Sequence, residues 1–199
     1  MIVTSRAILD WNKRYPNQTI ISNISRAEHN PEGVGLDLRA ESFYKIKKGN
    51  ALIGQGEERS TPIYEEINLV GEKNNKFVTF HPGEYIIAKT SERVALPEKG
   101  IELKSMGGGT RKVLLAAIIF PRSTLFRSGI LSVTTKVDPG YWGPVMVPMH
   151  NVGKDEARIQ QRARVANIVF MEAYDYIARP YEGPWSGGLI STHDFQAHK

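Results

Sequence analysis

Charged residues stand at both ends of the stretch "PRSTLFRSGILSVTTKVDPGYWG", which covers residues 121–143. Arg122 and Arg127 lie near its beginning, and Asp138 opens an Asp-Pro-Gly turn near its end. Guanidinium groups can hold an anionic ligand through planar donor forks, and a carboxylate can exchange protons with water. Taken alone, the arginines could equally form surface ion pairs, and Asp138 could serve only the geometry of the turn. The residues between them are strand-like, so we expect a short β segment that separates the two charges.

The formal net charge of +5 would suit a polyanionic partner such as a nucleotide phosphate. Lysine and arginine are nevertheless scattered along the chain, and their longest cluster is "YKIKKGN" at residues 44–50. No basic stripe with interleaved aromatic residues is present, as would be typical of a nucleic-acid surface. We therefore expect no nucleic-acid binding.

The 199 residues suffice for one domain with a short appendage. We expect one β domain over residues 1–178 and a tail rich in glycine and aromatic residues over 179–199. No apolar run reaches the roughly 18 residues needed to cross a bilayer, and the N-terminus lacks the pattern of a signal peptide. The chain has no cysteine, which excludes disulfides and thiolate metal sites. These features predict a cytoplasmic protein without membrane contact.

The elements that position the charged residues are expected to be mainly β-strands. A single short helix is expected over residues 4–16, capped by Thr4 or Ser5 and ended by Pro16. Residues 111–121 fit a helix or a strand by period alone, but flanking glycines and Pro121 favour a strand. Several short strands between Gly/Pro turns predict an antiparallel barrel or double-sheet roll. The other expected strand segments are 33–46, 76–97, 132–137, 144–152 and 163–174.

Two segments stand apart from this pattern. Residues 53–75 are polar and rich in turn residues, so we expect a long loop or lid. The tail over 179–199 carries Trp185 and could close over a ligand and stack on it, or be a disordered terminus.

Five blocks of this sequence, taken in order, resemble those of the superfamily of dCTP deaminases and trimeric dUTPases. The resemblance covers nearly the whole chain and is closest to the deaminase branch in the N-terminal helix and the "AKTSE" strand. One block is a weak signal, but five in the right order and spacing are a strong one. The blocks are "GVGLDLRA" (33–40), "HPGEYIIAKTSERVALP" (81–97), "PRSTLFRSGI" (121–130), "VDPGYWG" (137–143) and "RARVANIVF" (162–170).

The resemblance implies a mainly β fold, a distorted jelly roll or β-barrel of the dUTPase type with a short N-terminal helix. It also implies a homotrimer with active sites between subunits. Residues 99–112, which contain Gly107–Gly109, are longer than the family's usual connection before the Arg-Ser block, so we expect an inserted hairpin near the site. The ligand would be a deoxypyrimidine triphosphate, dUTP or dCTP, which usually carries Mg²⁺ on its phosphates rather than on protein side chains.

Individual roles carry over onto the matching residues. The phosphates would be bound by Arg122, Ser123 and Arg127, together with Asn167, which stands where the family usually has glutamine. The residues that would lie against the deoxyribose and the base are Tyr141, Val137 and Trp185. The choice between uracil and cytosine depends in this family on backbone groups, which the sequence does not reveal.

The family performs two reactions, and each needs its own acid–base group. Hydrolysis of the α–β phosphoanhydride needs a carboxylate base, and that role carries over to Asp138. Deamination needs a glutamate on the strand after the Asp-Pro-Gly turn, where this sequence has Pro148. His150 could titrate near neutral pH, but it lies two residues further on and would share the face of Pro148 only in a regular strand.

Three hypotheses therefore stand. The first is a dUTP diphosphatase that uses Asp138 as its base and forms dUMP and pyrophosphate. The second is a dCTP deaminase with relocated acid–base chemistry, forming dUTP or dUMP and ammonia. The third is a catalytically inactive nucleotide-binding relative, because Pro148 and Asn167 both depart from the family pattern.

Overall fold

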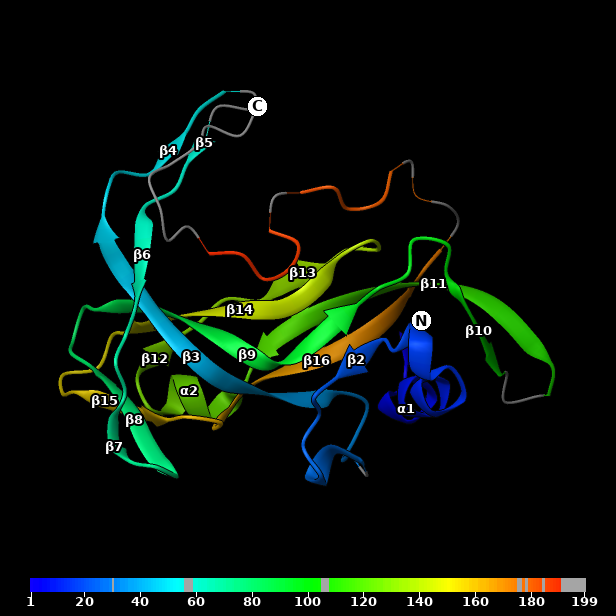
Figure 1. Ribbon diagram of the computed structural model, residues 1–199, viewed down its shortest axis with the longest axis horizontal. Helices are drawn as coiled ribbons and strands as arrows, with labels where there is room; N and C mark the ends of the chain where they lie inside the picture. Colours follow the sequence, from blue (N-terminus) through cyan, green and yellow to red (C-terminus); the bar gives the residue numbers. More distant parts are fainter. Residues whose placement is uncertain are drawn as a thin grey trace.

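A computed structural model of the chain describes residues 1–29, 31–55, 59–104, 108–174, 177, 179–183 and 185–190. After the short strand β1 (Ile2–Val3), helix α1 (Ser5–Arg14) packs at one end of a curled sheet (Figure 1). The Thr4 hydroxyl accepts a hydrogen bond from the Ala7 amide at 3.4 Å, and the helix ends just before Pro16. Ile8, Leu9 and Trp11 are buried in the core, so the predicted N-terminal helix is confirmed.

One antiparallel sheet of eleven strands makes up most of the molecule, with the central order β10-β11-β16-β3-β9-β14-β12. Four further strands pair with members of this order: β1 with β16, β13 with β11, β2 with β9 and β6 with β3. The remaining bounds are β2 (Ile21–Ser22), β3 (Leu36–Lys48), β6 (Ile63–Glu66), β9 (Tyr85–Ala95), β10 (Ile101–Lys104), β11 (Thr110–Pro121), β12 (Ile130–Leu131), β13 (Thr135–Val137), β14 (Trp142–Asn151) and β16 (Arg164–Ala173).

Smaller elements lie at the rim of this sheet. Two single-turn 3₁₀ helices, η1 (Pro16–Gln18) and η2 (Ala27–His29), flank β2. A second sheet joins β7 (Val70–Glu72), β8 (Asn75–Phe80) and β15 (Ala157–Gln160). The pair β4 (Leu52–Ile53) and β5 (Arg59–Ser60) forms an arm that projects from the body (Figure 1).

The core is built by alternation along the long strands. Every second residue of β9 from Ile86 to Val94 points inward and is buried, while its neighbours face outward or are half-buried. The largest fully buried side chains come from several strands of the curled sheet and from β8 of the second sheet, and include Leu36, Phe43, Phe80, Leu115, Ile119, Met149 and Phe170. The predicted mainly β architecture is therefore confirmed, including residues 111–121 as a strand.

Two of the five sequence blocks, residues 33–40 and 81–97, meet inside this core. The Glu92 carboxylate is fully buried and accepts hydrogen bonds from the Arg39 amide and the Arg39 Nε, each at 2.7 Å. The neighbouring Thr90 hydroxyl donates to the Glu92 carbonyl at 2.9 Å and accepts from the Val145 amide at 3.0 Å. These polar residues therefore join β3, β9 and β14, because buried polar groups need partners.

The structure corrects two local expectations. Residues 53–75 are not one long loop, because β6 pairs with the free edge of β3 and places Glu65 3.3 Å from the Lys45 ammonium. Residues 123–127 are not part of a β segment either, since they form the short helix α2 (Ser123–Arg127). Only Leu125 of this helix is buried, and the Ser128 amide closes the turn on the carbonyls of residues 124 and 125.

The predicted inserted hairpin is formed by β10 and β11, which pair from Ile101 opposite Val113 to Lys104 opposite Thr110. Strand β10 packs beside α1 (Figure 1), whereas β13 pairs with residues 117–119, further along β11. Gly107 lies outside the described residues. In the described part of the chain, no helix is long and apolar enough to cross a membrane.

Candidate active site

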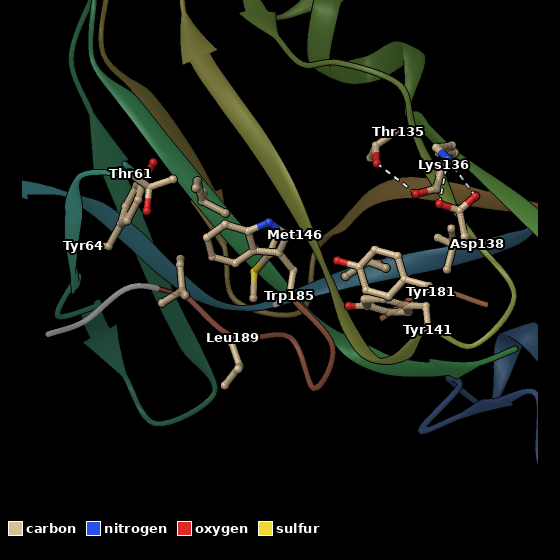
Figure 2. A pocket seen from close by; sticks show the side chains of 14 residues that line it. Thr61, Tyr64, Thr135, Lys136, Asp138, Tyr141, Met146, Tyr181, Trp185 and Leu189 are labelled. Atoms are coloured by element: carbon tan, nitrogen blue, oxygen red, sulfur yellow. Dashed lines mark hydrogen bonds and ion pairs between the residues drawn. The ribbon is translucent and has the colours of Figure 1, made fainter. Parts of the chain in front are cut away.

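A cavity of about 430 Å³ lies between β13, β14, the rim strand β6 and the described part of the C-terminal tail (Figure 2). It collects side chains from segments that are far apart in the sequence. Its lining residues are Thr61, Tyr64, Ile87, Thr135, Lys136, Val137, Asp138, Tyr141, Val145, Met146, Tyr181, Trp185, Leu189 and Ile190. Four of the predicted site residues, Val137, Asp138, Tyr141 and Trp185, are thus brought together.

Asp138 is placed by the end of β13, where Val137 pairs with Ala117 of β11. The turn that follows is fixed by backbone bonds, from the Tyr141 amide to the Asp138 carbonyl at 3.1 Å and from the Gly140 amide to the Leu96 carbonyl at 2.8 Å. The Asp138 carboxylate is half-buried and accepts from the Lys136 ammonium with both oxygens, at 2.8 and 2.7 Å. Within the described residues it bonds no amide of the turn, so the side chain is not explained by turn geometry.

Two tyrosines form the wall next to Asp138. The Tyr141 hydroxyl donates to the Pro144 carbonyl at 2.5 Å, and its ring meets that of Tyr181 edge-on with centroids 5.8 Å apart. Burial raises the pKa of Tyr141 to about 12, Tyr181 adds to the rise, and Arg93 opposes it. The phenol therefore stays neutral at physiological pH and offers an apolar ring face to the cavity.

The tail is held against the same turn by its backbone. The Tyr181 amide donates to the Pro139 carbonyl at 2.7 Å, and the Gly187 amide donates to the Trp142 carbonyl at 2.5 Å. A side chain at Gly143, which has a φ of +127°, would meet the Gly187 backbone at 2.6 Å. Close approach of the two segments therefore requires glycine, and it brings Trp185 and Leu189 over the cavity (Figure 2).

The opposite end of the cavity has no charged group among its described lining residues. Thr61 and Tyr64 come from β6 and the segment before it, and Met146 lies beneath Trp185 (Figure 2). Tyr64 shares a hydrogen bond with Tyr85, and burial raises the pKa of both, that of Tyr85 to about 12. The cavity thus has a charged end at Asp138 and an uncharged end at Tyr64.

Sequence reasoning missed several of these residues. Tyr64 fell in the segment expected to be a loop, and Tyr181 carried no motif. Lys136 could have been found, because it stands two residues before Asp138 on an expected strand and must share its face. Met146 could have been found in the same way, since it precedes Pro148 by two residues.

Arg122 and Asn167 lie in a different region, which we call the Asp37 cluster (Asp37, Arg122, Arg164 and Asn167). Asn167 stands directly opposite Asp37 on neighbouring strands and donates to its carboxylate at 3.1 Å. Arg164 donates to the same carboxylate at 3.1 Å, and Arg122 donates to it as well. The cluster is therefore a closed set of ion pairs and hydrogen bonds around one nearly buried carboxylate.

The two regions are well separated within one chain. Val137 pairs with Ala117, and Arg122 follows five residues later along β11, which is roughly 17 Å at about 3.3 Å per residue. Asp138 continues in the opposite direction because β13 is antiparallel to β11. Ser123 and Arg127 are exposed on α2, so the four predicted phosphate residues do not face the cavity of their own chain.

Pro148 and His150 do not complete the cavity. They stand opposite Ile87 and Tyr85 in a regular stretch of β14, so His150 does share the face of Pro148. The described pairing partner on the other edge, β12, reaches only His150 and Asn151, which leaves Pro148 at an open edge where a missing N–H is tolerated. Asp138 is the only carboxylate among the described lining residues, and none of them is a histidine.

The donor set also bears on metal binding. The described residues contain no group of three or more histidine, aspartate and glutamate side chains that could hold a metal ion. Mg²⁺ is usually bound through one or two carboxylates together with substrate phosphates rather than in an all-protein cage. A nucleotide polyphosphate in the cavity would supply phosphate oxygens for such an ion.

Comparisons with known proteins match one family over most of the chain. The family model described as dCTP deaminase-like matches residues 2–173. A dCTP deaminase of Pyrococcus horikoshii is 32% identical over 178 residues, which are 89% of this chain and 90% of that protein. The deoxyuridine 5'-triphosphate nucleotidohydrolase of Methanocaldococcus jannaschii is 28% identical over 153 residues, 77% of this chain and 85% of that protein.

Among solved structures, the 2'-deoxycytidine 5'-triphosphate deaminase from Agrobacterium tumefaciens matches with a TM-score of 0.56 at 14% identity. The match covers 86% of this chain, which spans 48% of the length of that structure's chain. At this identity the match shows a shared fold.

Proposed function

The chain belongs to the dCTP deaminase-like family, as the sequence resemblance predicted, and from this premise we propose that it is an enzyme of deoxypyrimidine nucleotide metabolism. The activity that the geometry supports best is that of a dUTP diphosphatase, which hydrolyses dUTP to dUMP and pyrophosphate. Both activities occur among the named relatives, so the choice between them depends on the site.

The observation that carries the proposal is the single carboxylate at one end of the cavity. Asp138 is half-buried, faces the cavity and stands at the polar end, where a polyphosphate would be hydrated. It would accept the proton of a water molecule as that water forms a new P–O bond and the α–β bond breaks. A general base of this kind contributes about 10²–10⁴-fold to the rate.

The aromatic residues would hold the nucleoside. Tyr141, neutral and fixed to the Pro144 carbonyl, presents its ring to the deoxyribose, and Val137 closes the pocket beside it. Trp185 would cover the base at the uncharged end, because every base has a face on which an indole can stack. The tail over 179–199 would then act as a lid held by its own backbone contacts.

The phosphate residues of this chain would act on a neighbour's ligand. Arg122, Ser123, Arg127 and Asn167 lie outside the cavity of their own chain, whereas Asp138 and Tyr141 lie within it. An assembly in which the Asp37 cluster of one copy faces the cavity of the next would complete the site. A homotrimer with closed symmetry satisfies this arrangement.

Mg²⁺ on the nucleotide phosphates would neutralise charge that develops on the leaving pyrophosphate. The ion would be held by the nucleotide phosphates without a direct protein ligand, and the residues of this chain would orient the nucleotide that carries it. We expect a soluble protein that meets its nucleotide in the cytoplasm.

The runner-up activity is dCTP deamination, favoured by the 32% identity to a named dCTP deaminase. The site gives it less support, because Pro148 offers no proton and the described side chains at the uncharged end of the cavity include no carboxylate and no imidazole. The third hypothesis, an inactive nucleotide binder, is motivated by Pro148 and Asn167.

One experiment separates the three. The pure protein is incubated with dUTP and with dCTP in the presence of Mg²⁺, and the nucleotides are resolved by ion-exchange chromatography. Formation of dUMP from dUTP is expected. Release of dUTP or dUMP from dCTP would instead establish deamination, and binding without any product would establish a nucleotide reader.

A further inference from the structure

The ion pair between Lys136 and Asp138 blocks the group that the proposed reaction needs. Both carboxylate oxygens accept from the same ammonium, at 2.8 and 2.7 Å. A carboxylate whose two oxygens both accept from an ammonium has fewer acceptor sites left to hold and orient a water molecule. In the free protein, the base is therefore held by a counter-ion.

Lys136 is the more exposed partner of this ion pair. Its side chain is 77% exposed, whereas that of Asp138 is 34% exposed, and in the described part of the chain Asp138 is the only side chain with which Lys136 forms an ion pair or hydrogen bond. An ion pair this exposed is worth at most about 1 kcal/mol, so a stronger partner can displace it. Lys136 also lines the cavity, which places its ammonium within reach of a ligand there.

A nucleoside triphosphate is such a partner. It carries several phosphate charges, against the single charge of Asp138, and an ammonium on a flexible four-carbon stem binds phosphate oxygens readily. A monophosphate carries fewer charges and does not extend as far.

Resting on the proposed function, we propose that Lys136 is a counter-ion that the polyphosphate of the substrate draws away from Asp138. Its transfer binds the triphosphate and frees the base in the same step. The pair then discriminates triphosphate from monophosphate, and the base becomes available when the substrate is in place.

The test is a comparison of binding and turnover in the variant Lys136→Met. We expect its affinity for the slowly hydrolysed analogue α,β-imido-dUTP, measured by calorimetry with Mg²⁺, to fall about tenfold. Affinity for dUMP should change less than about twofold, and kcat for dUTP should stay within about threefold, because Asp138 remains present and is already free. Lys136→Arg should retain most of the triphosphate affinity, and Lys13→Met, at an exposed position of α1, should behave as the wild type.

Two other patterns of change in kcat and nucleotide affinity would overturn the inference. If Lys136 merely holds Asp138 in place, Lys136→Met should lower kcat and leave the affinity for α,β-imido-dUTP unchanged. Equal losses for the triphosphate and the monophosphate would also contradict it. The binding measurements do not depend on turnover, and a wild type that binds neither nucleotide would overturn the proposed function itself.

Discussion

The cavity beside Asp138 and the Asp37 cluster both gather charged residues, but they leave them in different states. In the cavity, the only carboxylate among the described lining residues and an exposed lysine face about 430 Å³ of space between aromatic walls. In the cluster, Arg122, Arg164 and Asn167 converge on Asp37, and Glu28 accepts from the Asp37 amide at 3.0 Å. The cavity has room for a ligand, whereas the Asp37 cluster holds charged side chains in contact with one another.

We infer from this difference that the cavity and the Asp37 cluster of one chain supply different parts of a site. The cluster holds Arg122 rigidly at the end of β11 while its side chain remains 30% exposed. In the described part of the chain that side chain bonds only Asp37, and a guanidinium has five N–H donors. Arg122 is thus oriented by its own chain and has donors left for a phosphate presented by another copy.

The largest effect is expected in the cavity. Asp138→Asn should lower the turnover of dUTP by about 10²–10⁴-fold, because an amide cannot accept the proton of the attacking water. Nucleotide binding should not weaken, since the substitution also releases Lys136. Steady-state assays and calorimetry check both parts, with Asp10→Asn on the exposed face of α1 as the matched control. Retained turnover would remove Asp138 from the mechanism.

A smaller effect is expected in the cluster. Arg122→Ala should weaken binding of α,β-imido-dUTP by about 1.5–3 kcal/mol, the range for a hydrogen bond to a charged group. The fold should survive, because Asp37 keeps Arg164 and Asn167 as partners. Calorimetry measures the affinity, and Arg14→Ala at the end of α1 serves as control. An unchanged affinity would sink the assignment of Arg122 to the phosphates.

The contact between Trp185 and the base should contribute about as much to nucleotide binding as Arg122 does, or somewhat less. Trp185→Ala should weaken nucleotide binding by about 1–3 kcal/mol, the range for stacking of a base on an aromatic ring. Removal of Tyr174, which is 97% exposed, should have no effect and serves as the matched control. Equal affinities of Trp185→Ala and the wild type would mean that the tail does not cover the base.

The smallest effect concerns the cavity wall and pH. Because the pKa of Tyr141 is raised from 10.0 to about 12, the folded state keeps its proton where the unfolded state has lost it. This contribution to stability is fully present below pH 10 and declines as the pH rises to about 12. Urea unfolding across that interval should show a shallower decline for Tyr141→Phe than for the wild type, and identical slopes would contradict the burial of this phenol.

The sequence predicted the strands well because inward and outward residues alternate clearly in the long ones, such as Ile86 to Val94. It could not predict β6, whose residues 63–66 become a strand only through pairing with β3. It also could not predict α2, since five residues with one buried leucine carry too little periodicity.

The candidate site was predicted in part for a similar reason. Asp138 and Tyr141 lie in a recognisable block and Trp185 stood out in the glycine-rich tail, whereas Tyr64 and Tyr181 reach the cavity only through the folding of distant segments. The engagement of Arg122 by Asp37 depends on the register of β3 and β16, where Asn167 and Asp37 stand opposite each other. Such a register follows from the assembled sheet and not from any local motif.

The central claim is that the two regions form one active site across two copies of the chain. Asp138→Asn and Arg122→Ala chains can be coexpressed with different tags and purified through both tags, and dUTP hydrolysis can be measured at low substrate concentration. Each parent should be nearly inactive, and the mixed assembly should recover roughly a third of wild-type activity, because in a trimer that contains both chains one interface of the three unites two intact halves. Activity no higher than that of the two parents would contradict the account.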